Sequence, residues 1–131
     1  MSNDTRPAAP LGLSPAAVLD IAADVIERNG LAIGEFYMAE QGRDPRDCKV
    51  CAMGAIAVAA GLHPEAWDDE GITSAAEEAA DFLADRLGWT PDDEPAVTIV
   101  GSWNDRLKDA AKVAAELRAA AEAADAAHPT P

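Results

Sequence analysis

The chain has few of the residues from which active sites and metal centres are commonly built. Its 131 residues include two cysteines, two histidines and ten lysine or arginine residues, against 24 aspartate or glutamate residues. No apolar run approaches the ~20 residues that a membrane-spanning helix needs. The polar stretch from Met1 to Pro10 lacks the apolar segment of a signal peptide. We therefore expect no signal peptide, no membrane span and a cytoplasmic location, where cysteines stay reduced.

The scarcity of basic residues leaves a formal net charge of −14. Such a surface repels nucleic-acid backbones and anionic lipids, so we expect no direct nucleic-acid binding and no membrane association. Three uses of the charge stay open: solubility alone, a docking face for a protein partner, or an acidic mimic of nucleic acid that binds a DNA-binding protein. The identity of a protein partner and the oligomeric state cannot be predicted from charge.

What the chain has in abundance is alanine, about a quarter of its residues, within an apolar content of 49%. Alanine is the best helix former, and a chain of this length can bury a core without disulfides or metal. We therefore predict an all-α fold, a compact bundle of about four main helices around a buried central helix at about 48–60. The predicted single helical domain spans 14–127, between a disordered arm (1–13) and a frayed tail (128–131).

Local signals predict where the helices begin and end. Ser14-Pro15 is typical of a helix start, and Asn29-Gly30 is typical of a helix end. Asp47 is the predicted N-cap of the central helix. Gly54 interrupts the apolar side chains of that helix, so we expect another helix to approach it closely. Further helices are predicted at 74–87 and about 107–127, with an irregular segment at 31–47. The β-branched run 97–100 fits either a short extended piece or a strained turn of helix, and the conformation of 96–105 is left open.

Two cysteines form a Cys-x-x-Cys motif, Cys48 and Cys51, at the start of the predicted central helix. Helix N-termini stabilise thiolates, which favours a dithiol redox site, and the spacing also fits half of a zinc site. However, redox motifs of this kind follow a strand, and His63 lies beyond the far end of the helix. We favour a structural role, with Cys51 packed as a small hydrophobic residue, and expect no metal or other cofactor. The alternative is a thiol-dependent enzyme or redox protein centred on Cys51.

A second motif, Trp103-Asn104-Asp105, precedes the last predicted helix. In the structural interpretation, the tryptophan anchors the chain and the two polar side chains bind free N–H groups at the helix start. In the functional interpretation, Asn104 and Asp105 face a ligand beside an aromatic ring. We favour the structural interpretation and assign no catalytic residue. Cys51, Asn104 and Asp105 are the weak catalytic candidates if the protein is an enzyme.

Three groups of residues form a pattern along the chain: Leu19, Ala22, Ala23 and Ile26, then Cys51, Gly54, Ala55 and Ile56, then Trp103, Asn104 and Asp105. This pattern resembles an uncharacterised family of small actinobacterial and actinophage proteins. The resemblance covers residues 14 to about 125, and it implies a domain without implying a reaction. Cys48 is not part of the family pattern. We therefore predict a small soluble acidic accessory or interaction protein without catalytic activity.

Overall fold

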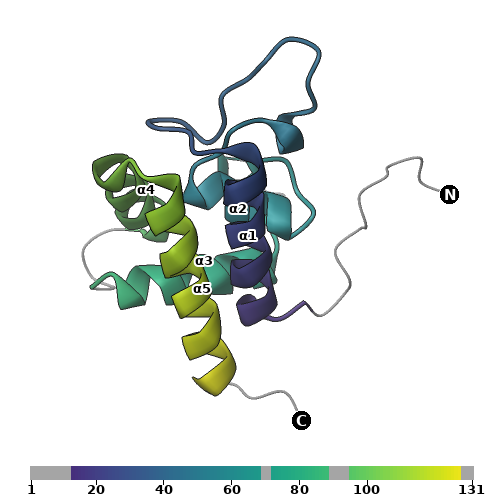
Figure 1. Cartoon of the computed structure of the whole chain (residues 1–131). Coiled ribbons are helices and arrows are strands. Elements are labelled where there is room, and N and C mark those ends of the chain that lie inside the picture. The colour runs from purple at the N-terminus through teal and green to yellow at the C-terminus, as the bar shows by residue number, and fades with distance from the viewer. Residues whose placement is uncertain (1–12, 69–71, 89–94, 128–131) are drawn as a thin grey trace, which may run out of the picture.

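The computed structural model of the protein describes residues 13–68, 72–88 and 95–127 (Figure 1). These residues form five α-helices and no β-strand, so the predicted all-α class is confirmed, with one more helix than expected. The predicted tail, and the predicted arm apart from residue 13, lie outside the described residues. The elements are α1 (Pro15–Asn29), α2 (Ala52–Ala59), α3 (Ser74–Arg86), α4 (Ala96–Leu107) and α5 (Ala110–Ala127), with short 3-10 turns η1 (Pro45–Asp47) and η2 (Ala66–Asp68).

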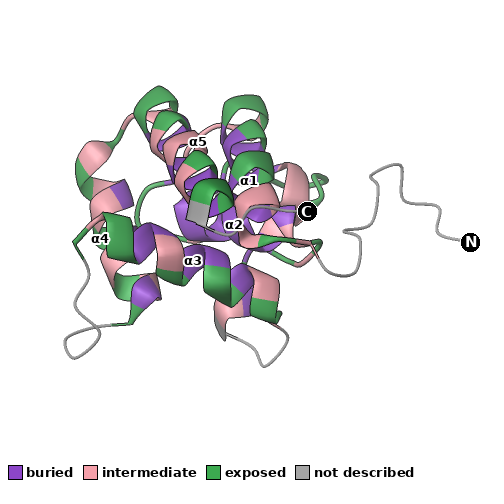
Figure 2. Ribbon diagram, turned by 90° about the horizontal axis from the view of Figure 1, so that it is seen from below, coloured by how far each residue is buried: buried purple, intermediate pink, exposed green. Residues whose placement is uncertain are grey.

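Helices α1 and α5 form the most extensive pair and run antiparallel, side by side (Figure 1). Helix α3 crosses them, and α1 also packs on α2 and α3. Helix α2 contacts α1, α3 and α4, and seven of its eight residues are buried. Buried residues lie on the faces that the helices turn towards one another (Figure 2). A short helix that is apolar on all sides is therefore buried along almost its whole length.

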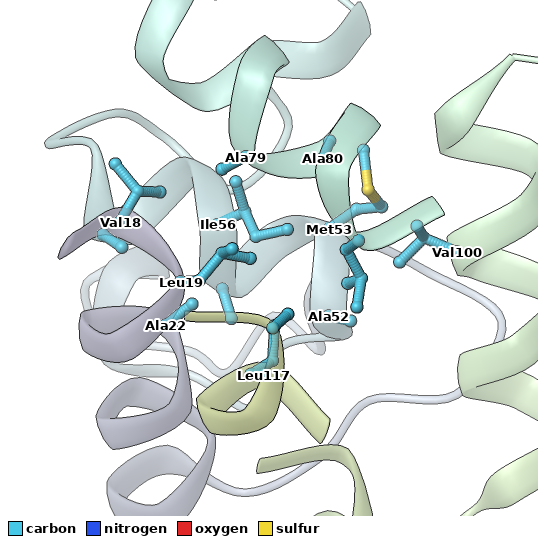
Figure 3. Close-up of a cluster of buried hydrophobic side chains, with 14 of the residues drawn as sticks. Val18, Leu19, Ala22, Ala52, Met53, Ile56, Ala79, Ala80, Val100 and Leu117 are labelled. Atoms are coloured by element: carbon cyan, nitrogen blue, oxygen red, sulfur yellow. The ribbon is translucent and has the colours of Figure 1, made fainter. Parts of the chain in front are cut away.

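The core combines a few large side chains with many alanines. Leu19 of α1, Ile56 of α2 and Leu117 of α5 are fully buried and lie close together (Figure 3). Small alanine side chains let the helix backbones approach one another around these larger residues. Other labelled members of the cluster are Val18, Ala22, Ala52, Met53, Ala79, Ala80 and Val100.

Both ends of α1 are confirmed by their capping contacts. The Ser14 side chain accepts a hydrogen bond from the Ala17 N–H at 3.1 Å, and Pro15 occupies the first helical position. Gly30 follows the helix with φ of 99° and donates its N–H to the Ile26 carbonyl. A positive φ favours glycine, which explains why the helix ends there.

The predicted start of the central helix was wrong. Asp47 does not cap α2; it ends η1, and α2 begins at Ala52 with Cys51 as its N-cap. The reason is non-local. Val50 is extended because its N–H donates to the Gly30 carbonyl at 3.2 Å and its carbonyl accepts from the Ala32 N–H at 2.9 Å. A helix could not include Val50 without losing both bonds.

The predicted boundary of the last helix was also wrong. Trp103, Asn104 and Asp105 do not lie at the start of the last helix; they lie within α4, which also contains the β-branched run 97–100. Lys108 ends α4 in the left-handed conformation, with φ of 52°. Asp109 then accepts a hydrogen bond from the Lys112 N–H at 3.1 Å, which caps the first turn of α5. The helix predicted at about 107–127 therefore joins the last residue of α4 to α5.

Gly54 does lie at a close approach, but the expected helix–helix contact was wrong. The neighbour is the loop backbone at Phe36, whose carbonyl also accepts a hydrogen bond from the Cys51 N–H at 3.1 Å. A Cβ atom at position 54 would overlap the Phe36 carbonyl oxygen. Glycine is therefore required so that the loop can cross the first turn of α2.

We expect Gly54→Ala to lower the free energy of unfolding by at least about 1–3 kcal/mol, because the added methyl group must displace the loop backbone. Gly101→Ala is a matched control in α4, since nothing lies within 4 Å of its Cβ position. The control should gain up to about 1 kcal/mol from better helix propensity. Urea denaturation measures both, and equal stability of Gly54→Ala and the parent would contradict the close approach.

Candidate functional site

The sequence candidates converge on one buried polar contact at the N-terminus of α2. Among the residues that the structure describes, Asn104 is the one buried polar side chain, with no exposed surface. Its Oδ1 accepts a hydrogen bond from the Ala52 N–H at 2.9 Å. Its Nδ2 donates to the Ala32 carbonyl at 3.0 Å. Both functions of the amide therefore bind backbone groups, one in α2 and one in the loop after α1.

Asp105 extends this contact along the same loop. Its Oδ1 accepts hydrogen bonds from the Gly34 N–H at 2.8 Å and from the Asn104 Nδ2 at 3.2 Å. We call this set of contacts, from Asn104 and Asp105 to the backbone of Ala32, Gly34 and Ala52, the amide clasp. The clasp joins α4 to the loop and to α2 at a single point.

The clasp provides a hydrogen-bond partner for one of the free N–H groups at the N-terminus of α2. The first N–H groups of any helix have no partner within the helix. Asn104 accepts from the first of these, Ala52, and the Cys51 thiol accepts from the Gly54 N–H at 3.3 Å. The expectation that Asn104 and Asp105 bind free N–H groups at the start of the last helix was therefore wrong. Asn104 binds the start of α2, and Asp105 binds the loop at Gly34.

The Cys51 thiol is poorly placed for nucleophilic chemistry. The residue is only 5% exposed, and burial raises the pKa of the thiol above its usual value of 9.0. Hydrogen bonds from the Gly54 and Met53 backbone partly oppose this increase, while the negative charge of Asp105 adds to it. The thiol is therefore neutral near pH 7, and a neutral thiol is a weak nucleophile.

The thiol of the second cysteine is also buried and hydrogen-bonded within the fold. Cys48 is fully buried, its thiol donates to the Asp44 carbonyl at 3.5 Å, and both cysteines are free thiols. His63 packs edge to face on Tyr37, with ring centres 5.3 Å apart, and its Nδ1 accepts from the Glu65 N–H. Across residues 13–68, 72–88 and 95–127, no three histidine, cysteine or acidic residues are grouped to hold a metal ion.

Sequence reasoning identified the clasp side chains but missed what they bind. Ala32 and Ala52 contribute only backbone atoms, which leave no pattern in the side chains. The glycine at position 34 is a weak signal in the sequence, because glycine marks places where the backbone needs a positive φ. Gly34 does have a φ of 79° in the structure. Trp103 packs against the core half-buried and is absent from the clasp contacts.

The fold and the clasp define a small all-α protein in which the most distinctive polar residues hold the chain together. The chain belongs to a family of unknown function, DUF6197, which matches residues 10–123, so membership of an uncharacterised family is confirmed. No curated protein and no solved structure matches the chain. No helix in the described part has the length and apolar character needed to cross a membrane.

We expect Asn104→Ala to lower the free energy of unfolding by about 1–3 kcal/mol or more, because it leaves the Ala52 N–H and Ala32 carbonyl buried without a partner. Asn29→Ala is the control. It removes a bond from Nδ2 to the Arg46 carbonyl at 2.8 Å and an exposed bond from Arg28 Nε to Oδ1 at 3.1 Å. Because Asn29 is only half-buried, the loss should cost about 0.5–1.5 kcal/mol. Chemical denaturation compares the two. A smaller loss for Asn104→Ala than for Asn29→Ala would refute the structural role of the clasp.

We expect Cys51 to react slowly with iodoacetamide in the native protein at pH 8. Its raised pKa leaves fewer thiolates than in the unfolded chain, where the pKa is near 9.0, and its burial excludes the reagent. Peptide mass spectrometry should show labelling at least about 100-fold faster in denaturant, since native labelling then requires opening of the fold. Native labelling of Cys51 as fast as in the denatured chain would instead favour a thiol-dependent function.

Proposed function

We propose that this protein is a non-catalytic acidic interaction protein that acts by binding another protein. The observation that carries the proposal is the amide clasp, because it gives the leading candidate residues a structural role. Asn104 has no exposed surface, and both its Oδ1 and its Nδ2 are hydrogen-bonded to backbone groups. A catalytic group must touch a substrate, and an enclosed, fully bonded amide offers no atom for that contact.

The surface then carries the most distinctive remaining property, its negative charge. Part of the charge is neutralised within the fold: Arg118 of α5 binds Asp20, Asp24 and Glu27 of α1. These pairs fasten α5 to α1, but they do not change the net charge of −14, which already includes Arg118. An acidic surface accelerates the encounter with a basic protein and selects against acidic ones. A mimic of nucleic acid, which binds a basic DNA-binding protein, is a special case of this proposal.

The competing proposal is a thiol-dependent enzyme or redox protein centred on Cys51. Its support is the position of Cys51 as N-cap of α2, with the thiol at the N–H groups of the first turn. Burial acts in the opposite direction and raises the pKa of that thiol, which favours the non-catalytic proposal. Two free buried cysteines also fit a reducing compartment, and we propose a cytoplasmic location.

Affinity capture from a host lysate tests the proposal, with the full chain as immobilised bait. We expect a specific protein to be retained at low salt and released at high salt, since screening weakens contacts between opposite charges. A Cys51→Ser bait is the matched variant: its hydroxyl still caps α2, but the thiol is gone. It should retain the same protein equally well. Retention of no specific protein, or retention that requires the Cys51 thiol, would overturn the proposal.

A further inference from the structure

A groove lies on the surface where η2, α3 and the start of α4 meet. Its volume is about 320 Å³, at the lower end of the range for ligand pockets, which suits one or two side chains. One wall is rigid, because the Trp67 indole N–H donates to the Met53 carbonyl in α2 at 2.7 Å. The lining combines six apolar residues, Trp67, Ile72, Ala80, Pro95, Ala96 and Val97, with two carboxylates, Glu77 and Asp81.

The two carboxylates of the groove have no cationic partner in the described part of the chain. Glu77 and Asp81 are exposed and lie four residues apart on α3, so their like charges face the same side of the helix. Partial burial and the charges of Glu77 and Glu78 raise the pKa of Asp81. A cation held at this position would relieve the repulsion. Elsewhere in the fold such repulsion is relieved internally, as Arg118 does for α1.

We propose that this groove binds a segment of a protein partner that presents an arginine or lysine beside an apolar side chain. The proposal rests on the proposed function and names the site through which it acts. The head group of the basic residue pairs with Glu77 and Asp81. Its aliphatic stem and the adjacent apolar side chain pack on Trp67 and Val97, as long basic side chains commonly do on apolar surfaces. Arginine has the further advantage that its planar head group binds carboxylates and stacks on aromatic rings.

Charge and chemistry exclude the other occupants of the groove. A second copy of the chain carries the same net charge of −14, and nucleic acid is also negative, so both are repelled. Divalent metal ions such as Ca²⁺ take six to eight oxygen ligands, whereas the groove offers two carboxylates beside apolar walls. A basic and apolar peptide segment complements both halves of the lining.

Titration with a short, end-blocked peptide that alternates arginine and leucine tests the site, with amide chemical shifts in NMR spectra as the readout. We expect shifts around Ile72, Val97 and the Trp67 indole N–H. Glu77→Gln with Asp81→Asn should weaken the peptide Kd about tenfold or more, because both contacts to the cation are lost. A peptide with glutamine in place of arginine should not bind, and one with glycine in place of leucine should bind more weakly.

The matched control is Glu122→Gln with Asp125→Asn, which makes the same chemical change at two exposed positions of α5. It should change the Kd less than about threefold, the effect of net charge alone. A second variant, Val97→Lys, places a cation in the groove and should also block the peptide. Equal weakening by the α3 and α5 pairs, or shifts that map away from the groove, would overturn the proposal.

The two experiments distinguish a failure of the groove proposal from a failure of the proposed function. If a captured protein binds the parent and the Glu77→Gln, Asp81→Asn variant equally, the protein is an interaction protein that uses another face, and the groove proposal is overturned. If the lysate yields no specific protein but the peptide binds as expected, the groove has the stated chemistry and the proposed function is overturned. Thermal melts confirm that each variant is folded.

Discussion

The buried amide of Asn104 is the contact on which the rest of the structure depends. It binds three segments that are distant in sequence: α4, which carries it, the loop at Ala32 and the start of α2 at Ala52. A buried polar group without a partner is costly, so these three backbones hold one relative position or the amide loses its bonds. The path of the loop across Gly54 and the first turn of α2 follow from that position.

How much of the fold could be predicted depended on where the determining contacts lie. The ends of α1 were predictable, because Ser14 and Gly30 act on backbone groups a few residues away. The start of α2 was not, because the pairing of Val50 with the segment after α1 extends residues that look helical in isolation. Residues 97–100 are helical although β-branched residues have weak helix propensity. That weak propensity costs about a few tenths of a kcal/mol per residue, and the burial of Val100 in the core outweighs it.

The candidate site shows the same division. Cys51, Gly54 and Asn104 could be singled out because a thiol, a glycine and an amide are unusual in an alanine-rich apolar setting. Their partners could not, because each is a backbone group: the Gly54 N–H, the Phe36 carbonyl and the Ala52 N–H. The groove was also invisible in the sequence, since η2, α3 and α4 meet only after the helices pack.

The pairing of α1 with α5 has a consequence for biosynthesis. The contact between Asp24 and Arg118 joins residues 94 positions apart, and α5 is the last helix of the described chain. During synthesis, α1 therefore leaves the ribosome long before its main packing partner exists. Until α5 emerges, α1 lacks its most extensive packing partner. The domain completes its fold only after α5 has been synthesised, and a chain that stops after α4 exposes a surface that chaperones recognise.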